Sequence, residues 1–150
     1  IYFMNLFHPV SSIMTTDLIT VSPNDAISKV EFIFNNHKIH HIPVVTGAKL
    51  VGLVSKSDCL LFQHSDSDDH DQQKNEAIRM ERHLVEEIMV TGIAKLEPTE
   101  KISVALAIFK ENIFHSIPIV DQGRLVGIVT TYDIISKLMV DNEAHIGYGT

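Results

Sequence analysis

Apolar and polar positions along this chain follow a pattern that occurs twice. Residues 10–60 overlay residues 85–135 without a gap, and 18 of the 51 aligned positions are identical. Such an internal duplication predicts two copies of one supersecondary unit, packed about a pseudo-twofold axis. The cleft between the copies is then the expected place for a ligand.

Each copy is expected to begin with a short helical segment and a short strand. Apolar spacings of three and four predict one or two helical turns within residues 5–14, and again within residues 76–89 of the second copy. The apolar runs at residues 18–21 and 93–96 predict the two strands.

A first helix is expected to begin at Ser22 in copy one and at Pro98 in copy two. Ser22 can cap a helix, Pro23 suits the first helical position, and Asp25 stands where a capping box has its carboxylate. The helical spacing then places four apolar residues of each copy on one face: Ile27, Val30, Ile33 and Phe34 in the first, and Ile102, Ala105, Ile108 and Phe109 in the second.

Two buried strands and a second helix complete each copy. The strands are expected at residues 42–45 and 50–54, and at residues 117–120 and 125–129, with Gly47 and Gly123 in the turns. The second helices are expected to follow Asp58 and Asp133. The predicted fold class is therefore α/β (α+β), with two pseudo-symmetric β-α-β-β-α repeats packed into one module.

The predicted organisation is a lead-in at 1–9, repeat one at 10–62, an acidic linker at 63–76, repeat two with a lead-in helix at 77–140, and a loose tail at 141–150. The linker carries five acidic residues against one lysine and almost no apolar residue, which is typical of a solvated, mobile segment. Met4 is expected to be the native start, with residues 1–3 a non-native addition.

The net charge of −7 argues against nucleic acid or an anionic membrane as the main partner. No apolar run approaches the roughly 20 residues of a membrane span. The single cysteine, Cys59, allows no intrachain disulfide, is expected to pack in the core, and favours a cytoplasmic location. Because the chain has neither a nucleophile elbow nor a Gly-Lys-Ser/Thr phosphate loop, we expect no catalytic role.

The candidate chemistry lies where the second strand of each hairpin ends. Gly52, Ser55 and Asp58 recur as Gly127, Thr130 and Asp133. Glycine lets a ligand or another backbone approach closely, a hydroxyl and a helix N-terminus can donate to a phosphate, and a carboxylate can accept from both ribose hydroxyls. The same spacing also fits helix caps, and spacing alone does not separate the two interpretations.

These residues resemble a tandem pair of CBS domains, the family named after cystathionine β-synthase. The matching segments are Val10-x-x-Ile-Met-Thr, Thr20-Val-Ser-Pro, His41-Ile-Pro-Val-Val and residues 50–58, each with a counterpart 75 positions on. The resemblance covers residues 10 to about 140. It implies a stand-alone regulatory module that requires no cofactor, binds AMP, ADP, ATP or S-adenosylmethionine as a regulatory ligand, and signals to a separate, unknown protein.

The resemblance also implies which residues hold the ligand. Ribose and phosphate would contact Ser55, Lys56, Asp58, Thr130, Thr131 and Asp133. Adenine would lie against Thr16, Ile19, Thr20, Ile39 and His40 of copy one, or against Thr91, Ala94, Lys95, Phe114 and His115 of copy two. Sites in the family join the adenine residues of one copy to the acidic motif of the other. Lys56 and Lys95 make the Asp58 site the more basic one, so we expect it to prefer the more phosphorylated nucleotide.

The second helices predict an interface. Their apolar residues are Leu60, Leu61 and Phe62 in copy one, and Ile134, Ile135, Leu138, Met139 and Val140 in copy two. One copy cannot cover both sets, and exposed apolar patches usually mark interfaces. Together with the resemblance, this predicts a homodimer that forms a flat disk of four CBS units.

Two alternatives remain open. The first is a dimerisation or protein-interaction module that binds no ligand. The second is a metal-responsive protein that uses the nine histidines and the acidic linker, because imidazole and carboxylate are common metal ligands. For His40 and His115, the alternative to a phosphate contact is a half-buried ring hydrogen-bonded at the seam between the copies.

Overall fold

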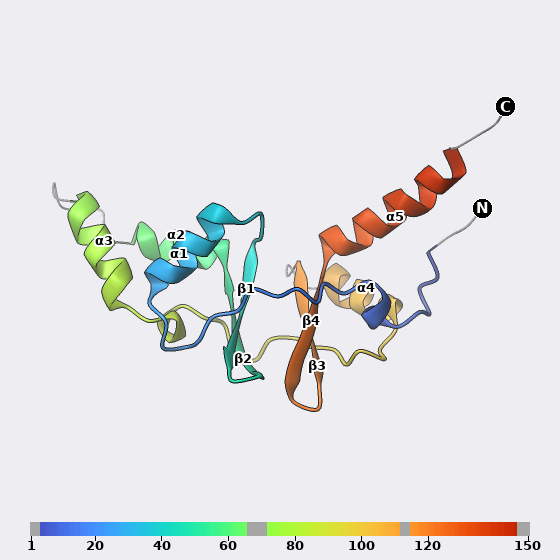
Figure 1. Cartoon of the computed structure of the whole chain (residues 1–150), viewed down its shortest axis with the longest axis horizontal. Coiled ribbons are helices and arrows are strands. Elements are labelled where there is room, and N and C mark those ends of the chain that lie inside the picture. The colour runs from blue at the N-terminus through green and yellow to red at the C-terminus, as the bar shows by residue number, and fades with distance from the viewer. Residues whose placement is uncertain (1–3, 66–71, 112–114, 147–150) are drawn as a thin grey trace. The chain divides into compact units, whose positions relative to one another are not determined.

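The computed structural model describes residues 4–65, 72–111 and 115–146 (Figure 1). The chain forms two compact units, one of Ile19–Ile93 and one of Ile1–Leu18 with Ala94–Thr150. Each unit combines a β-hairpin with helices, so the α+β class and the twofold repetition are confirmed. The first residues of each repeat, with the segment before them, belong to the unit of the other repeat, and these segments, residues 4–18 and 83–93, are called the lead-ins.

The Ile19–Ile93 unit is built on an antiparallel hairpin. Its elements are α1 (Ile27–Asn36), β1 (His41–Thr46), β2 (Lys49–Ser55), α2 (Lys56–Gln63), α3 (Gln72–Arg82) and the 3-10 turn η2 (Val85–Glu87). Val44 pairs with Gly52 across the hairpin, and Gly47 takes the positive φ of the turn. The buried core is made of Val21, Ile27, Val30, Ile33, Phe34, Ile42, Val44, Val54, Cys59, Met80 and Val85.

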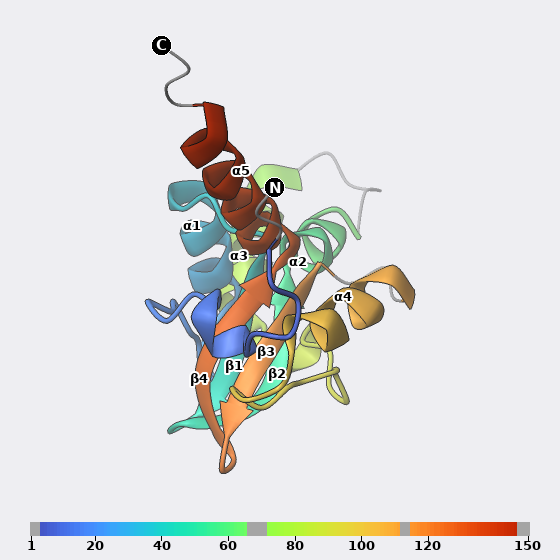
Figure 2. The ribbon, with the colours of Figure 1, turned by 90° about the vertical axis from the view of Figure 1, so that its right-hand side faces the viewer.

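The other unit has the same plan. Its elements are η1 (Val10–Ser12), α4 (Ile102–Glu111), β3 (Ser116–Asp121), β4 (Arg124–Thr130) and α5 (Thr131–Ile146), and Figure 2 shows α5 leaving the end of β4. Ile119 pairs with Gly127, and Gly123 lies in the turn with φ +79°. The buried core is made of Met4, Val10, Leu96, Ile102, Ala105, Ile117, Ile119, Val129 and Ile134. The predicted hairpins are confirmed in both units.

Each lead-in segment is tied to its unit by backbone hydrogen bonds. Thr15 and Ile128 exchange two of them, with N···O distances of 2.9 and 3.0 Å. Val90 and Leu53 exchange the equivalent pair at 2.8 and 3.0 Å. The lead-ins therefore extend the hairpins by one antiparallel bridge each, next to Gly127 and Gly52.

The first helices begin four residues after Pro23 and Pro98, the first helical positions that the sequence predicts. Ser22 and Asp25 close a turn, in which the Ser22 N–H donates to Asp25 Oδ2 at 2.8 Å, and α1 starts only at Ile27. That hydrogen bond, and then the Lys29 ammonium at 2.9 Å, lower the pKa of Asp25. The Ile27 N–H donates to the carbonyl of His83, so a backbone group of the lead-in, and not a side-chain cap, satisfies the first N–H of α1.

The equivalent helix of copy two begins at Ile102, not at Pro98, for the same reason: its first N–H donates to the carbonyl of His8 at 2.9 Å. The predicted strands at residues 18–21 and 93–96 shrink to single parallel bridges, Val21 to Val44 and Leu96 to Ile119. The apolar faces of both first helices are buried or half-buried as predicted.

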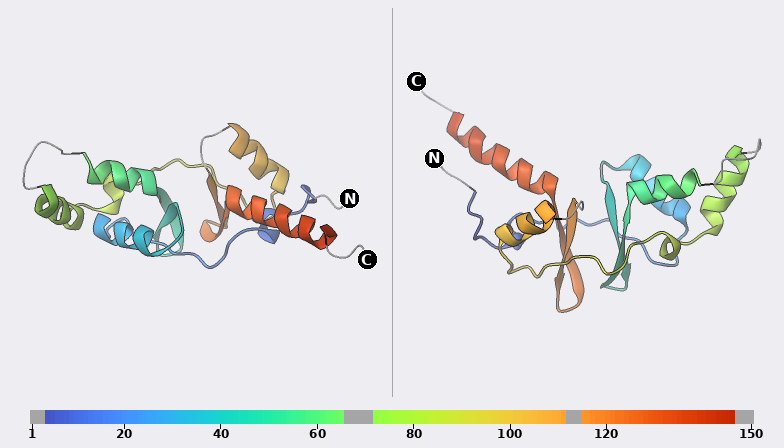
Figure 3. Two further views of the ribbon diagram at one scale, coloured as in Figure 1. Left: turned by 90° about the horizontal axis from the view of Figure 1, so that it is seen from above. Right: turned by 180° about the vertical axis from the view of Figure 1, so that it is seen from behind.

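The acidic linker is shorter than predicted, because residues 72–76 belong to α3. This helix is anchored by tertiary contacts: Met80 is 1% exposed, and the Arg79 guanidinium lies 5.0 Å from the centroid of Phe62. The Arg79 side chain also donates to the carbonyls of Phe62 and Gln63. At the other end, α5 runs to Ile146 and includes six residues of the predicted tail (Figure 3).

Cys59 lies in the core, as predicted, with 3% of its surface exposed. Burial raises the pKa of its thiol to about 11, with smaller contributions from the carboxylates of Glu31 and Asp58. We expect the free energy of unfolding to include a contribution from this thiol below about pH 9, which is lost as the pH rises through about 11, since the folded state holds the proton more tightly. Urea titrations of the wild type and of Cys59→Ala between pH 8 and 11 would measure it. Parallel curves for the two proteins would contradict this expectation.

Candidate functional site

In the Ile19–Ile93 unit the candidate motif forms a helix cap. Ser55 is the N-cap of α2, and its hydroxyl accepts from the N–H of Asp58 at 3.0 Å. The Asp58 carboxylate reaches back, and its Oδ2 accepts from the N–H of Ser55 at 3.3 Å. Helix α2 therefore begins at Lys56, three residues before the predicted start, because Asp58 occupies the third helical position.

The motif of Thr130 and Asp133 forms the same kind of helix cap, with more hydrogen bonds. The N–H of Asp133 donates to the Thr130 hydroxyl at 3.1 Å. Asp133 Oδ2 accepts from the Thr130 N–H at 2.8 Å and from its hydroxyl at 3.0 Å. Asp133 Oδ1 accepts from the hydroxyl of Thr15, at 3.0 Å. The capping interpretation that the spacing left open is thus present in both repeats, and Asp133 additionally binds the lead-in.

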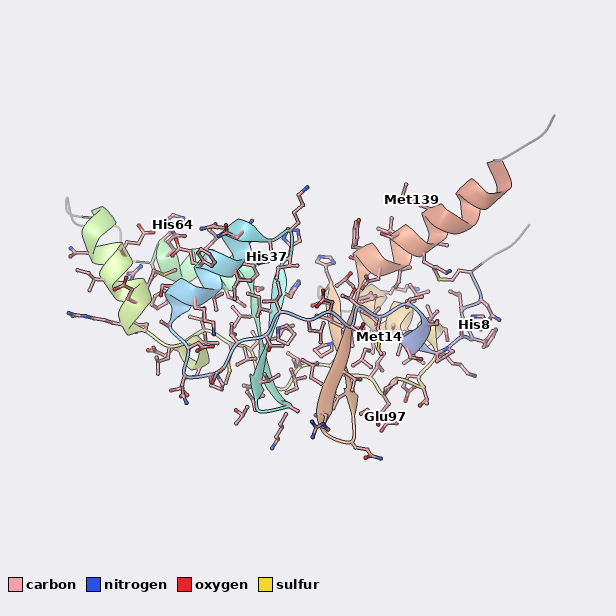
Figure 4. The ribbon with its side chains drawn as sticks, in the orientation of Figure 1. His8, Met14, His37, His64, Glu97 and Met139 are labelled. Carbon is pink, nitrogen blue, oxygen red and sulfur yellow. The ribbon has the colours of Figure 1, made fainter. Side chains whose placement is uncertain are left out.

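The glycines of the two motifs make room for the lead-ins. A Cβ on Gly52 would lie 2.7 Å from the sulfur of Met89, and a Cβ on Gly127 would lie 2.6 Å from the sulfur of Met14. Met14 lies beside β4 in Figure 4. At Gly127 the backbone carbonyl of Thr15 is also only 3.2 Å away. The close approach predicted for these glycines therefore serves a methionine of the lead-in.

Gly127→Ala should destabilise its unit by about 1–3 kcal/mol, because both a side chain and a backbone oxygen would have to move. Gly52→Ala is the matched control. Its close contacts are all to the flexible Met89 side chain, so we expect a smaller loss. Urea denaturation of both variants measures the difference, and a larger loss for Gly52→Ala would contradict the explanation.

The residues just before each hairpin lie beside the motif of the same unit. The N–H of Lys56 donates to the carbonyl of His40 at 2.8 Å, and the N–H of Thr131 donates to the carbonyl of His115 at 3.1 Å. Both histidines are exposed, whereas the alternative to a phosphate contact expected their rings to be half-buried. The backbones of both histidines thus lie at the helix N-termini, and their side chains are accessible to solvent.

The other residues predicted to contact adenine have unequal surroundings. Thr16, Thr91, Ala94 and Lys95 are exposed, and Thr20 is half-buried. Ile19 and Ile39 pack against the core of their unit, so part of each side chain is already in contact with protein. Phe114 lies outside the described residues. Thr16 follows the residue that binds Asp133, and Thr91 follows the residue paired with Leu53, so each lies near the motif of its own unit.

Two residues near the motifs were missed by the sequence analysis. Thr15 was passed over because only its neighbour Thr16 belongs to the segment that the family resemblance assigns to adenine. Ser116 pairs with Thr130 across the hairpin, is 4% exposed, and its hydroxyl has no hydrogen-bond partner among the described residues. The alignment of the two repeats, in which Thr15 faces Val90, is the only sequence signal that could have identified Thr15. Nothing in the sequence marks Ser116.

Of the two lysines expected to make the Asp58 site the more basic one, Lys56 belongs to the unit of Asp58 and Lys95 to the other unit. Lys56 opens α2 next to Asp58, whereas the uncharged Thr131 opens α5. Among the residues that the structure describes, no group of three or more histidine, cysteine or acidic side chains is placed to hold a metal ion. His70 and the aspartates at 66, 68, 69 and 71, on which the metal alternative also depends, lie outside the described residues.

Comparison with known proteins gives a consistent picture. The family model described as CBS domain matches residues 10–65 and 85–140. The CBS domain-containing protein YhcV of Bacillus subtilis is 30% identical over 135 residues, which cover 90% of this chain and 89% of YhcV. No described helix is long and apolar enough to cross a membrane.

Two solved structures show the same fold. The Vibrio cholerae protein AcuB superposes with a TM-score of 0.78 at 22% identity, covering 97% of this chain and all of its own. CBSX2, a CBS-pair protein of Arabidopsis thaliana, was solved in complex with AMP. That complex superposes with a TM-score of 0.72 at 24% identity and covers 89% of this chain and 97% of CBSX2.

Proposed function

The chain belongs to the CBS domain family, and from that premise we propose that it is a regulatory module that binds an adenosine-containing ligand. The observation that carries the proposal is the surroundings of Asp58. Its carboxylate has an oxygen to which no described residue donates, and Ser55 and Lys56 stand three and two residues before it, at the start of α2. Such a group can accept ribose hydroxyls while the helix start and Lys56 face a phosphate.

The candidate ligands are AMP, ADP, ATP and S-adenosylmethionine. CBSX2, which shares the fold, binds AMP in its solved complex, and this supports a nucleotide for the present chain. Lys56 favours the more phosphorylated nucleotides at the Asp58 motif, since Thr131 brings no charge to the other. The predicted position of the ligand, between adenine residues of one repeat and the acidic motif of the other, stays a prediction.

In this proposal the module is non-catalytic and cytoplasmic, and it reports energy state to a separate protein. A ligand that binds one conformation better than another shifts the population toward it, and the partner responds to that shift. In both motifs the hydroxyl and the carboxylate are engaged as a helix cap, which fits binding better than chemistry.

The proposal includes a homodimer formed through the second helices. Leu61 of α2 is 71% exposed, and Ile135 and Met139 of α5 are 55% and 57% exposed. Apolar side chains exposed to this degree along one helix are typical of an interface. A monomeric mass in light scattering at micromolar concentration would contradict the dimer.

A thermal-shift screen with AMP, ADP, ATP and S-adenosylmethionine tests the proposed function. Binding to the native state alone raises stability, by about 2.7 kcal/mol at a ligand concentration of 100 Kd. We expect at least one nucleotide to raise Tm by several degrees, whereas inosine monophosphate at equal concentration, which lacks the adenine amino group, has a smaller effect. No shift with any of the four ligands would favour the protein-interaction alternative, and a shift with divalent metal ions alone would favour the metal-responsive one.

A further inference from the structure

The carboxylates of the two acidic motifs differ in the hydrogen bonds that they accept. Asp133 accepts three hydrogen bonds, from the Thr15 hydroxyl, the Thr130 N–H and the Thr130 hydroxyl, all between 2.8 and 3.0 Å. Asp58 accepts one, from the Ser55 N–H at 3.3 Å. Across the described part of the chain, no group donates to Asp58 Oδ1, whereas Asp133 Oδ1 is taken by Thr15.

The hydrogen bond to Asp133 Oδ1, which has no counterpart at Asp58, comes from one position of the lead-ins. Thr15 forms its backbone bridge with Ile128, and Val90 forms the same bridge with Leu53, so the two residues are structurally equivalent and 75 positions apart. Their side chains have nearly the same shape, but threonine carries a hydroxyl where valine carries a methyl. Thr15 can therefore donate to the carboxylate of its motif, and Val90, which is 40% exposed, cannot.

We propose that this lead-in position decides which acidic motif receives the ribose of the ligand. Val90 leaves Asp58 able to accept both ribose hydroxyls, whereas the Thr15 hydroxyl competes with the ribose for Asp133. A ligand at Asp133 must displace or share an existing hydrogen bond, so its net gain there is smaller. The inference rests on the proposed function and adds to it that the Asp58 motif is the tighter site.

Calorimetric titration with AMP tests the ranking of the two sites. Asp58→Asn keeps the size of the side chain and removes the charged acceptor, and we expect it to weaken AMP binding at least tenfold, because hydrogen bonds to charged groups are the stronger ones. Asp133→Asn is expected to weaken binding only about twofold. Equal losses in the two variants would overturn the ranking.

Exchanging the lead-in residues tests the cause, without touching either carboxylate. Val90→Thr places a hydroxyl beside Asp58 and should weaken AMP binding about fivefold, the value of one net hydrogen bond. Val90→Ile adds bulk but no hydroxyl and should weaken it less than twofold. In the Asp58→Asn background, Thr15→Val should strengthen the remaining AMP binding about fivefold, and Thr15→Ser, which keeps the hydroxyl, should not.

Comparison of AMP with 2′-deoxy-AMP separates recognition of the ribose from a loss of structure. The wild type should prefer AMP, and Val90→Thr should reduce that preference, whereas a merely structural defect would weaken both ligands equally. Val90→Thr and Val90→Ile behaving alike would overturn the inference and leave the proposed function intact. A wild-type protein that binds none of AMP, ADP, ATP and S-adenosylmethionine would overturn both.

Discussion

Val10→Asp should unfold one unit of the chain and leave the other folded. Val10 is fully buried in the core of the unit that contains repeat two, although it stands at the start of repeat one in the sequence. An unpaired carboxylate at such a site costs about 4 kcal/mol or more, a large part of the stability of a small unit. Hydrogen exchange should therefore accelerate in residues 94–111 and 115–146.

Matched variants make this result specific. Ser11→Asp puts the same charge at the neighbouring exposed position and should change exchange little. Val85→Asp replaces the equivalent buried residue of the second lead-in and should accelerate exchange in residues 19–65 instead. If Val10→Asp acted mainly on residues 19–65, the assignment of the lead-ins to opposite units would be wrong.

Met80→Ala should destabilise the Ile19–Ile93 unit by about 2–4 kcal/mol. Met80 is 1% exposed and belongs to the buried core, so its truncation removes apolar contacts and leaves a cavity. The loss would show that α3 is an integral part of this unit. Urea denaturation followed by circular dichroism provides the measurement.

Ile78→Ala is the control on the same helix. Ile78 is 45% exposed, so its truncation should cost less than about 1 kcal/mol. Similar midpoints for Met80→Ala and Ile78→Ala would mean that α3 is not anchored through Met80, and that the sequence-based description of this stretch as a solvated linker is the better one.

The sequence predicted those elements whose signal is local. The hairpins at β1–β2 and β3–β4 have near-continuous apolar runs and a glycine in the turn, and they lie where expected. The helix starts were misplaced because the caps are not local: the carbonyls of His83 and His8, from the lead-ins, accept from the first N–H groups of α1 and α4. A single sequence carries no sign of such a distant partner.

The candidate site shows the same limit. The repeated glycine, hydroxyl and aspartate identified both motifs, and the structure places each hydroxyl and aspartate at the start of a helix as a cap, with the glycine in the strand before it. Which carboxylate has an available oxygen could not be predicted, since that depends on the register between Thr15 or Val90 and the strand it meets. The side chain that fills the space beside each glycine, Met14 or Met89, follows from the same register.

The structure of the chain crystallised with AMP tests the central claim most directly. The account predicts that the ribose hydroxyls lie within about 2.6–3.2 Å of the Asp58 carboxylate, with the phosphate toward Ser55 and Lys56. AMP bound away from both acidic motifs, with Asp58 still accepting only from the Ser55 N–H, would contradict it.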